Sequence, residues 1–399
     1  MARWIVEHNP EVRAERARVL AAHQAVSVAK LYQNPSLDLG VAGLAVGKPT
    51  PSSDLSYGQT ISFGIGVSQT FEIGKRAPRT RAAQHRDSAE GLNYHELLIE
   101  KLQDGREALG RIAYLKARQQ VLEERIEQAK TVIELDQIRL DRGDVSGTDH
   151  DRLLLEEASV QREADENRAD LAEALAFCDV ALSTSCAPFN PSLDQVEGAT
   201  PLPGALPDAA HEAQSAPAIL ALREENAASQ EDAKFWRKHS VPDPTVGISY
   251  TRDFYTYAGN QPHTLGVSAS IPLPFFDNGS SQASVSEAEG QAAKAEADAL
   301  VVQVAGESHG LVSRKAALEH KLELIQKDLL PRAQGVVKSA DAGYQQGQLS
   351  MTDRLLVRRD LLALQLDELE TRFNLFLVRS RLRRSLGIDA KDLASFGAN

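Results

Sequence analysis

Aromatic residues make up only 5% of this 399-residue chain. Basic residues are outnumbered by acidic ones, because 44 Lys and Arg stand against 56 Asp and Glu, and the net charge is −12. Binding to nucleic acid requires a basic face, so this charge balance argues against a nucleic-acid partner. A single thick globular core is normally richer in large apolar side chains. The composition instead favours long helices with solvated faces of mixed charge.

Long hydrophobic runs are absent as well. No apolar stretch approaches the ~20 residues of a transmembrane helix. Residues 1–10 also lack the basic and apolar regions of a signal peptide, so for an exported chain we expect a signal that is not among these residues. Neither absence excludes membrane-spanning strands, which need only ~10 residues of alternating polarity.

Motifs of catalysis and of cofactor binding are missing too. The ten histidines are scattered without the spacing of a zinc site, and no glycine-rich phosphate loop follows a predicted strand. The presence of only two methionines disfavours a Met-lined relay for copper or silver. We therefore expect no enzyme activity, no cofactor and no tightly bound metal.

The chain has two cysteines, Cys178 and Cys186. No His or acidic residue accompanies them at a spacing suited to a metal or catalytic site. The helix that carries Cys178 is expected to end near Ser183, so that Cys186 lies in a turn that can fold back. In an oxidising compartment we expect the two to form a local disulfide.

The sequence repeats itself with a period of about 200 residues, which indicates a duplicated unit. The segment G-D-V-S-G-T-D at 143–149 matches G-Q-L-S-M-T-D at 347–353 without a gap. In the same order, G-V-S-Q-T-F at 66–71 matches G-V-S-A-S-I at 266–271. A proline-rich stretch at 187–210 lies between the halves and is predicted to be an irregular connector.

Each half is expected to contain a helix, a strand hairpin, a very long helix, a glycine-containing turn and a further helix. The first repeat, 1–186, has its hairpin at 36–72, its long helix at 75–141, its turn at 143–149 and its last helix at 150–183. The second repeat, 211–399, has the corresponding elements at 244–274, 279–345, 347–353 and 354–386, followed by a C-terminal tail.

The long helices are the clearest prediction. From residue 75 to 141 the only proline is Pro78, in the first turn, where proline is tolerated. In the second repeat Pro331 interrupts the helix, and we expect a kink or break there. The last helix carries a seven-residue repeat that fits a coiled-coil seam and, equally well, packing within its own chain; its members are Leu355, Leu362, Leu369 and Phe376, with Leu366 and Phe373 between them.

The strands alternate in polarity over about ten residues, which is the length that spans a membrane. In the second strand, at 60–71, Ile61, Phe63 and Ile65 share one face with the apolar residues that follow, and small polar residues and glycines form the other. The fourth strand, at 264–273, alternates in the same way, and those at 36–46 and 245–254 do so less cleanly. Such strands also occur in half-buried soluble sheets, but aromatic residues gather near these strand ends, as in an interfacial girdle: Tyr57, Phe235, Trp236, Phe254, Tyr255, Tyr257, Phe275 and Phe276.

Four strands cannot close a barrel, and an open sheet edge cannot lie in lipid. A membrane location therefore requires several copies of the chain. Two copies would make eight strands, a barrel filled by its own side chains. A conducting lumen prefers three or more copies.

The whole architecture resembles the outer-membrane efflux protein (TolC-like) family across nearly the entire chain. The residues that carry the resemblance are the two turns and Tyr344, which precedes the second turn as in the family's Y-x-x-G pattern. The likeness is greater to heavy-metal efflux members of the cobalt–zinc–cadmium type. F-E-I-G-K-R at 71–76 resembles their E-L-G-G-K-R segment, and I-P-L-P-F-F-D-N-G at 271–279 resembles their exit from the fourth strand. The second turn lacks the family's usual arginine.

The resemblance implies a homotrimer with a twelve-stranded β-barrel in the lipid of the Gram-negative outer membrane and a long α-helical barrel in the periplasm. It implies passive efflux of divalent heavy-metal cations. It also implies two partners, a periplasmic adaptor (membrane fusion protein) at the glycine turns and an inner-membrane pump of the resistance–nodulation–division (RND) class.

The two turns are accordingly the expected functional sites. Gly143 and Gly347 suit a left-handed helix end, and either Ser146 and Ser350 or Thr148 and Thr352 can cap the next helix. These six residues are candidates for adaptor docking, although a plain capping device explains them as well. The candidates for a gate, where rings of three carboxylates would favour cations and arginines could bridge to them, are Asp149, Arg152, Asp353 and Arg354. Solvated cap residues remain the alternative for each.

The sequence is compatible in part with two other functions. A periplasmic adaptor or helical scaffold explains the long helices but not the two strand hairpins. A TolC-like channel for drugs or other organic compounds would differ only in its cargo.

Overall fold

The computed structural model describes residues 1–44, 61–204, 206–254 and 261–397. The first half of the chain has four helices and two strands in this part: α1 (Ala2–His8), α2 (Pro10–Ala29), β1 (Ser36–Ala42), β2 (Ser62–Thr70), α3 (Arg76–Asp141) and α4 (Gly147–Leu182). The second half repeats this order: α7 (Pro217–Arg237), the 3₁₀ turn η2 (Lys238–Ser240), β3 (Thr245–Asp253), β4 (His263–Ser270), α8 (Ser280–Leu324), the π-helical turn η3 (Ile325–Leu329), α9 (Leu330–Gln345), α10 (Met351–Ser385) and α11 (Ile388–Gly397). The predicted mainly helical chain with four strands and a two-fold repeat is confirmed.

The connector between the halves is more regular than the prolines suggested. It contains two short helices, α5 (Leu193–Gly198) and α6 (Ala209–Ala213). At the start of α5, the Ser192 side chain accepts a hydrogen bond from the Gln195 backbone, and the Gln195 side chain reaches back to the Ser192 backbone. This capping box is readable in the sequence as S-x-x-Q, so the helix could have been predicted.

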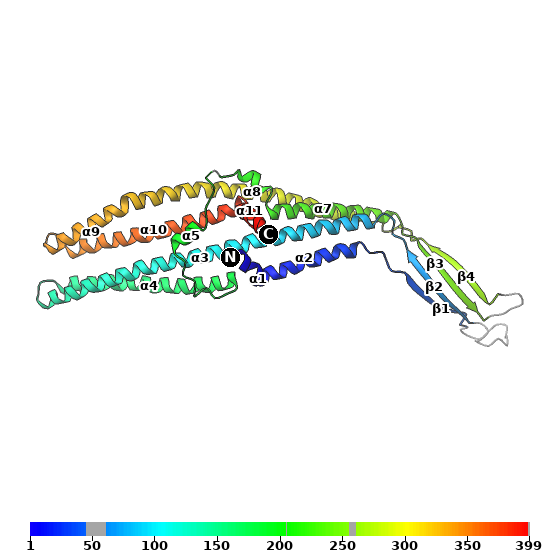
Figure 1. The fold of residues 1–399 in the computed structure, drawn as a ribbon, viewed down its shortest axis with the longest axis horizontal. Coiled ribbons are helices and arrows are strands. Elements are labelled where there is room, and N and C mark those ends of the chain that lie inside the picture. The colour runs from blue at the N-terminus through cyan, green and yellow to red at the C-terminus, as the bar shows by residue number, and fades with distance from the viewer. Residues whose placement is uncertain (45–60, 205, 255–260, 398–399) are drawn as a thin grey trace. The chain divides into compact units, whose positions relative to one another are not determined.

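The chain forms two compact units. Figure 1 shows the ribbon with colours that follow the residue number. Unit 1 consists of residues 1–17, 92–220 and 298–399, and unit 2 of residues 18–91 and 221–297. None of the described helices is long and apolar enough to pass through a membrane.

In unit 1, α3 and α4 pack as an antiparallel coiled coil. Buried residues of α3 follow one another at spacings of three and four, as knobs-into-holes packing requires: Ala108, Ile112, Leu115, Gln119, Leu122 and Ile126. The matching row of α4 includes Val160, Ala164, Asn167, Ala174 and Cys178. Inside this seam the Asn167 side chain donates to the Gln119 side chain over 2.9 Å. A polar pair inside an apolar seam is satisfied in one register only, so it helps to align the two helices.

The seam predicted on α10 packs within its own chain, which decides between the two interpretations left open above. Leu362 lies in a cluster with Leu122 and Ile126 of α3, and Phe373 and Phe376 pack against the connector helix α5. The fully buried Phe376 ring occupies the place beside Gly110, where a Cβ would stand 2.1 Å from it. Glycine at 110 therefore makes room for this ring.

The break expected at Pro331 takes the form of the π-helical turn η3, which ends two residues before the proline. A proline has no N–H and its ring clashes with the carbonyl four residues earlier. Widening the preceding turn avoids this clash while the helix continues as α9.

In unit 2, the helices pack through alanines. The buried apolar residues of these helices are small: Val26, Ala29, Ala82, Ala89, Ala221, Ala228, Ala233, Ala283, Ala293 and Ala297. Small side chains let helix backbones approach closely. The packing in unit 2 therefore relies on close contact between helices and not on the burial of large side chains.

Candidate functional site

The four strands of unit 2 form one antiparallel sheet in the order β1-β2-β3-β4 (Figure 1). Rows of paired residues cross it and alternate in character. One row joins Leu39, Ile65, Tyr250 and Leu265, and the next row on the same face joins Leu37, Val67, Ile248 and Val267. These apolar side chains stand uncovered: Leu265 and Val267 are each 81% exposed.

The opposite face of the sheet carries small and polar residues. Its rows are Asp38, Gly66, Ser249 and Gly266, then Gly40, Gly64, Thr251 and Thr264. The Ser68 hydroxyl donates to the Asp38 carboxylate over 2.8 Å across this face. The sheet thus separates an apolar surface from a polar one, as strands between lipid and a wet lumen do.

The edge strands β1 and β4 each have one hydrogen-bonded neighbour among the described residues. Backbone N–H and C=O groups along their outer sides are therefore free to pair with another chain.

The aromatic residues expected near the strand ends are placed differently from one another. Phe254 follows β3 and meets Phe63 edge to face, with ring centres 5.9 Å apart. Phe235 and Trp236 lie in the last turn of α7, not at a strand end. The three residues predicted at the same side as Phe254, namely Tyr57, Tyr255 and Tyr257, lie outside the described residues.

The two glycine turns of unit 1 have the same local structure. Gly143 and Gly347 have φ angles of +80° and +73°, in the left-handed region that favours glycine. After each glycine a backbone N–H reaches back five residues, from Asp144 to the Arg139 carbonyl and from Gln348 to the Gly343 carbonyl, over 2.9 and 2.8 Å. This bonding is the Schellman motif that ends a helix with a sharp reversal.

Serine, and not threonine, caps the helix that follows each turn. The Ser146 hydroxyl accepts from the Asp149 N–H and donates to its carboxylate over 2.9 Å. The Ser350 hydroxyl makes the same two bonds with Asp353, the second over 2.6 Å. Both aspartates lie in the first turn of a helix, where a negative charge is favourable.

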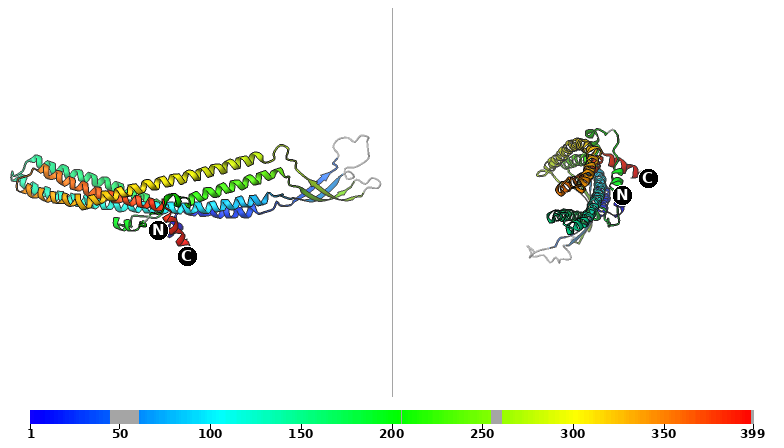
Figure 2. Two further views of the ribbon diagram at one scale, coloured as in Figure 1. Left: turned by 90° about the horizontal axis from the view of Figure 1, so that it is seen from above. Right: turned by 90° about the vertical axis from the view of Figure 1, so that its left-hand side faces the viewer.

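The two turns lie at the same end of unit 1 in both views of Figures 1 and 2. Arg152 of α4 joins them, because its Nη1 donates to the Thr352 hydroxyl of α10 over 2.6 Å. Arg152 also lies 3.5 Å from the Asp149 carboxylate. Among the residues that the structure describes, the Thr148 hydroxyl makes no such bond to the other turn, so the two matching threonines have different contacts.

Arg354 turns away from its neighbour Asp353. Its Nε donates to Asp341 of α9 over 2.7 Å, and Arg358 donates to the same carboxylate. Burial alone would raise the pKa of Asp341, but the hydrogen bonds from Arg358 and Arg354 outweigh it and hold that pKa below the ordinary value of 3.8. The Arg354 guanidinium also lies over the Tyr344 ring, 4.9 Å from its centre.

A buried polar pair near the first turn was not predicted. His150 Nδ1 lies 3.2 Å from the Asp136 carboxylate, and the Asp136 residue is only 3% exposed. The pair links α4 to α3 across the hairpin. The sequence offers no signal for it, since the contact depends on the register in which the two helices pack.

Cys178 and Cys186 are joined by a disulfide, and both are fully buried. α4 ends at Leu182, and the next residue, Ser183, has a φ of 52°, in the left-handed region; this reversal brings Cys186 back to the helix. The Asp179 carboxylate accepts from the Cys186 N–H over 2.5 Å. The disulfide packs in the apolar cluster with Ile5, Leu102 and Leu182.

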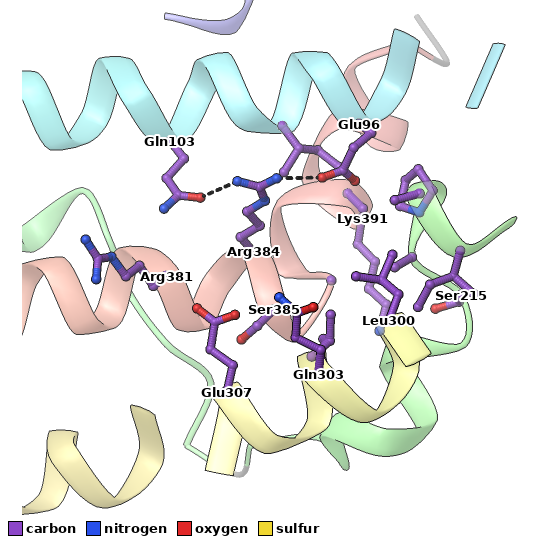
Figure 3. Close-up of a pocket in the computed structure, with 18 residues that line it drawn as sticks. Glu96, Gln103, Ser215, Leu300, Gln303, Glu307, Arg381, Arg384, Ser385 and Lys391 are labelled. Carbon is purple, nitrogen blue, oxygen red and sulfur yellow. Dashed lines mark hydrogen bonds and ion pairs between the residues drawn. The ribbon is translucent and has the colours of Figure 1, made fainter. Parts of the chain in front are cut away.

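A cavity of about 730 Å³ lies in unit 1 among α3, α8, α10 and α11. Figure 3 shows Arg384 between Gln103 and Glu96, 2.7 Å from the latter. Lys391 is paired with Glu212 over 2.8 Å, and Arg381 lies 3.5 Å from Glu107. These three basic side chains at the cavity already pair with carboxylates, and the pairs link the helices around it. Within the described part of the chain, no three His, Cys, Asp or Glu side chains are grouped to hold a metal ion.

Comparison with known proteins gives one family and one fold. The profile of the family described as outer membrane efflux protein matches residues 4–184 and 210–388, once in each half. No significant match was found among curated protein sequences.

Three of the similar solved structures share the TolC-like arrangement, which the sequence had predicted and which is thereby confirmed. The channel CusC has a TM-score of 0.79 at 15% identity, covering 96% of this chain and 90% of its own. VceC, an outer membrane protein of Vibrio cholerae, has 0.77 at 17%, covering 97% and 95%. The CmeC outer membrane channel of Campylobacter jejuni has 0.81 at 12%, covering 99% and 88%. Identities this low show the fold alone.

Proposed function

Because the chain belongs to the outer membrane efflux protein family, we propose that three copies assemble into a channel that conducts cargo passively from the periplasm to the exterior. Membership makes the protein an outer-membrane efflux channel and not an enzyme. It also removes the rival interpretation as a periplasmic adaptor or helical scaffold.

The proposal of a trimer is supported mainly by the open sheet of unit 2. Its four strands present an exposed apolar face, a polar face and two free edges. Three copies would supply twelve strands, pair every edge and turn the polar faces toward one lumen. The long helices would then extend into the periplasm.

The oligomer is tested by extracting the protein in detergent and measuring its mass by light scattering, with and without heating. We expect a trimer that dissociates on heating and forms conducting pores in planar bilayers. A single chain that stays monodisperse in buffer without detergent would contradict the proposal.

The glycine turns are proposed as the place where a periplasmic adaptor docks, which would couple the channel to an inner-membrane RND pump. Around Gly143 and Gly347 a Cβ would find open space, and neighbouring residues such as Ser146, Thr148 and Ser350 are exposed. A bulky substitution, Gly347→Leu, is expected to weaken cross-linking to the adaptor, and Gly306→Leu in the middle of α8 is the control. Normal cross-linking together with normal efflux in Gly347→Leu would refute the docking site.

The same end of unit 1 is proposed as a gate. In a trimer Asp149 and Asp353 would each form a ring of three carboxylates, with Arg152 tying the two turns together. Asp149→Ala and Asp353→Ala are expected to raise the conductance of the closed channel. Unchanged conductance in both variants would remove these residues from the gate.

The cargo we propose is a divalent heavy-metal cation, treated as substrate and not as a resident ligand. Support comes from the exposed carboxylates at the turns, which would attract cations by their charge: Asp141, Asp144, Asp151 and Asp353. A drug or other organic cargo is the second candidate, because the pump can set selectivity. Growth of a deletion strain on zinc, cobalt and cadmium salts and on a panel of organic toxins tests the two, and sensitivity to organic compounds alone would overturn the metal assignment.

A further inference from the structure

Cations gather in unit 2 where the helices meet the strands. Lys30 follows α2, Arg76 begins α3, and Lys238 lies in η2 before β3. The contacts between these segments show that they are neighbours: the Arg79 guanidinium donates to the Leu31 carbonyl over 3.0 Å. Lys238 Cδ stands 3.7 Å from the position that a Cβ on Gly74 would occupy.

Two basic side chains close to these residues pair with carboxylates of the same chain. Lys75 pairs with Asp243 over 2.6 Å, and Arg79 pairs with Glu72 over 2.7 Å. After β4, the Asp277 carboxylate accepts the Gly279 N–H.

Three other cations lack such a partner. Lys30 and Lys238 are exposed, and neither has a carboxylate within ion-pair distance in the part of the chain that the structure describes. Arg76 lies over the Tyr32 ring, 4.1 Å from its centre, and likewise meets no carboxylate among those residues. The net charge of the whole chain is −12, so these three basic residues contrast with the acidic overall composition.

Exposed apolar side chains accompany these cations. Tyr32 is 72% exposed, and Phe275 and Phe276 after β4 are 80% and 105% exposed. Phe71 and Ile73, which follow β2, are also exposed and continue from the apolar face of the sheet. Aromatic and aliphatic groups beside unpaired Lys and Arg side chains are typical of a membrane interface, where the apolar part meets acyl chains and the cation meets a phosphate.

We propose that Lys30, Tyr32, Arg76 and Lys238, here called the junction patch, bind the phosphate groups of anionic phospholipids in the leaflet nearer the helices. The proposal rests on the proposed function, since it requires the strands to lie in the outer membrane. The Arg76 guanidinium lies over the Tyr32 ring and can offer two parallel N–H groups to one phosphate. Lys30 and Lys238 add point charges, each worth about a fivefold change in affinity for an anionic surface.

The test uses the purified full chain and measures bound lipid by native mass spectrometry, with phosphatidylglycerol or phosphatidylcholine as the added lipid. We expect the protein to prefer phosphatidylglycerol. In Lys30→Gln/Lys238→Gln the affinity for phosphatidylglycerol should fall about 25-fold, while that for phosphatidylcholine should stay unchanged. Lys294→Gln is the matched control, because Lys294 is an exposed lysine of the same unit on α8.

Three results would overturn the junction patch: no preference of the unaltered protein for phosphatidylglycerol, an equal loss in Lys294→Gln, or full displacement of the lipid by millimolar inorganic phosphate, which would assign the patch to a free anion. The failure of the proposed function looks different, since the protein would then neither enter bilayers nor conduct ions. A protein that conducts normally without preferring phosphatidylglycerol would refute the patch alone.

Discussion

Arg152 and Thr352 stand 200 positions apart in the sequence, yet Nη1 of the arginine donates to Oγ1 of the threonine over 2.6 Å. The bond connects the start of α4 with the start of α10, the helices that follow the two matching turns. It is one contact through which the two repeats meet at this end of unit 1; the Arg139 guanidinium of the first repeat also lies over the Tyr344 ring of the second, 5.5 Å from its centre.

We predict that Arg152→Gln raises the conductance of the closed channel. An exposed charge-assisted hydrogen bond contributes about 1 kcal/mol, so its loss should change the ratio of open to closed states about fivefold. Thr352→Val should have a similar effect. The measurement is single-channel recording in planar bilayers.

The matched control for this gate is Arg162→Gln. Arg162 lies on the same helix and, among the described residues, forms its ion pair with Glu166, four residues on. A conductance change of equal size in this control would show that charge on α4, and not the bond between the turns, sets the conductance.

A second prediction concerns the helix reversal at Gly347. An alanine at this left-handed position costs about 1 kcal/mol, because its Cβ crowds the following carbonyl. Gly347→Ala should therefore speed amide hydrogen exchange in the first turn of α10 about fivefold. Gly335→Ala, in the regular helix α9 with open space around the new Cβ, should slow exchange or leave it unchanged. Equal behaviour of the two variants would contradict a strain-based account.

A third prediction is a pH dependence at Asp341. Its folded-state pKa is depressed by hydrogen bonds from Arg358 and Arg354, so its contribution to stability is present above about pH 4 and is lost as the pH falls through the depressed value. Asp341→Asn should lower the free energy of unfolding by about 2 kcal/mol at pH 7, and the difference from the unaltered protein should shrink at pH 3. Thermal unfolding followed by circular dichroism at both pH values measures this.

Asp367→Asn is the control for Asp341, since Asp367 on α10 makes a more exposed ion pair with Lys321. We expect it to change stability by less than about 1 kcal/mol. If the destabilisation by Asp341→Asn were the same at pH 3 as at pH 7, the charge of Asp341 would not be its cause.

The fourth prediction concerns the disulfide. Replacing both cysteines, in Cys178→Ser/Cys186→Ser, should destabilise unit 1 by about 2–3 kcal/mol, mainly because the unfolded chain gains freedom. Both sulfur atoms are inaccessible, so the native protein should resist reduction and become reducible only when it unfolds. Rapid reduction under native conditions, read by thiol alkylation and mass spectrometry, would contradict this.

Several features were predictable because their causes are local. The long helix expected at 75–141 extends over Arg76–Asp141, since no proline interrupts it after the first turn and Gly143 ends it. The alternation of Ile65 and Val67 with glycines gave the correct faces of β2, because side chains in a strand change sides at every residue. The connector helix α5 was missed although Ser192 and Gln195 signalled it.

Other features could not be predicted, because a charged side chain has several possible partners in the sequence and only the packing of the helices selects one. Arg354 has an acid beside it in sequence, Asp353, yet it binds Asp341 of the neighbouring helix. Asp353 is engaged by the Ser350 cap, so only the packing of α9 against α10 reveals the actual pairing. The same holds for Asp136 and His150, whose contact requires a particular helix register.

The order of elements, the two-fold repeat, the glycine reversals and the two faces of each strand follow from the sequence by itself, because backbone sterics, capping and side-chain periodicity act over a few residues. Only the tertiary structure decided which charges pair, that Arg152 reaches Thr352, and that Arg76 lies over the Tyr32 ring. These relationships depend on distances between segments that are remote in the chain, and local preferences carry no information about such distances.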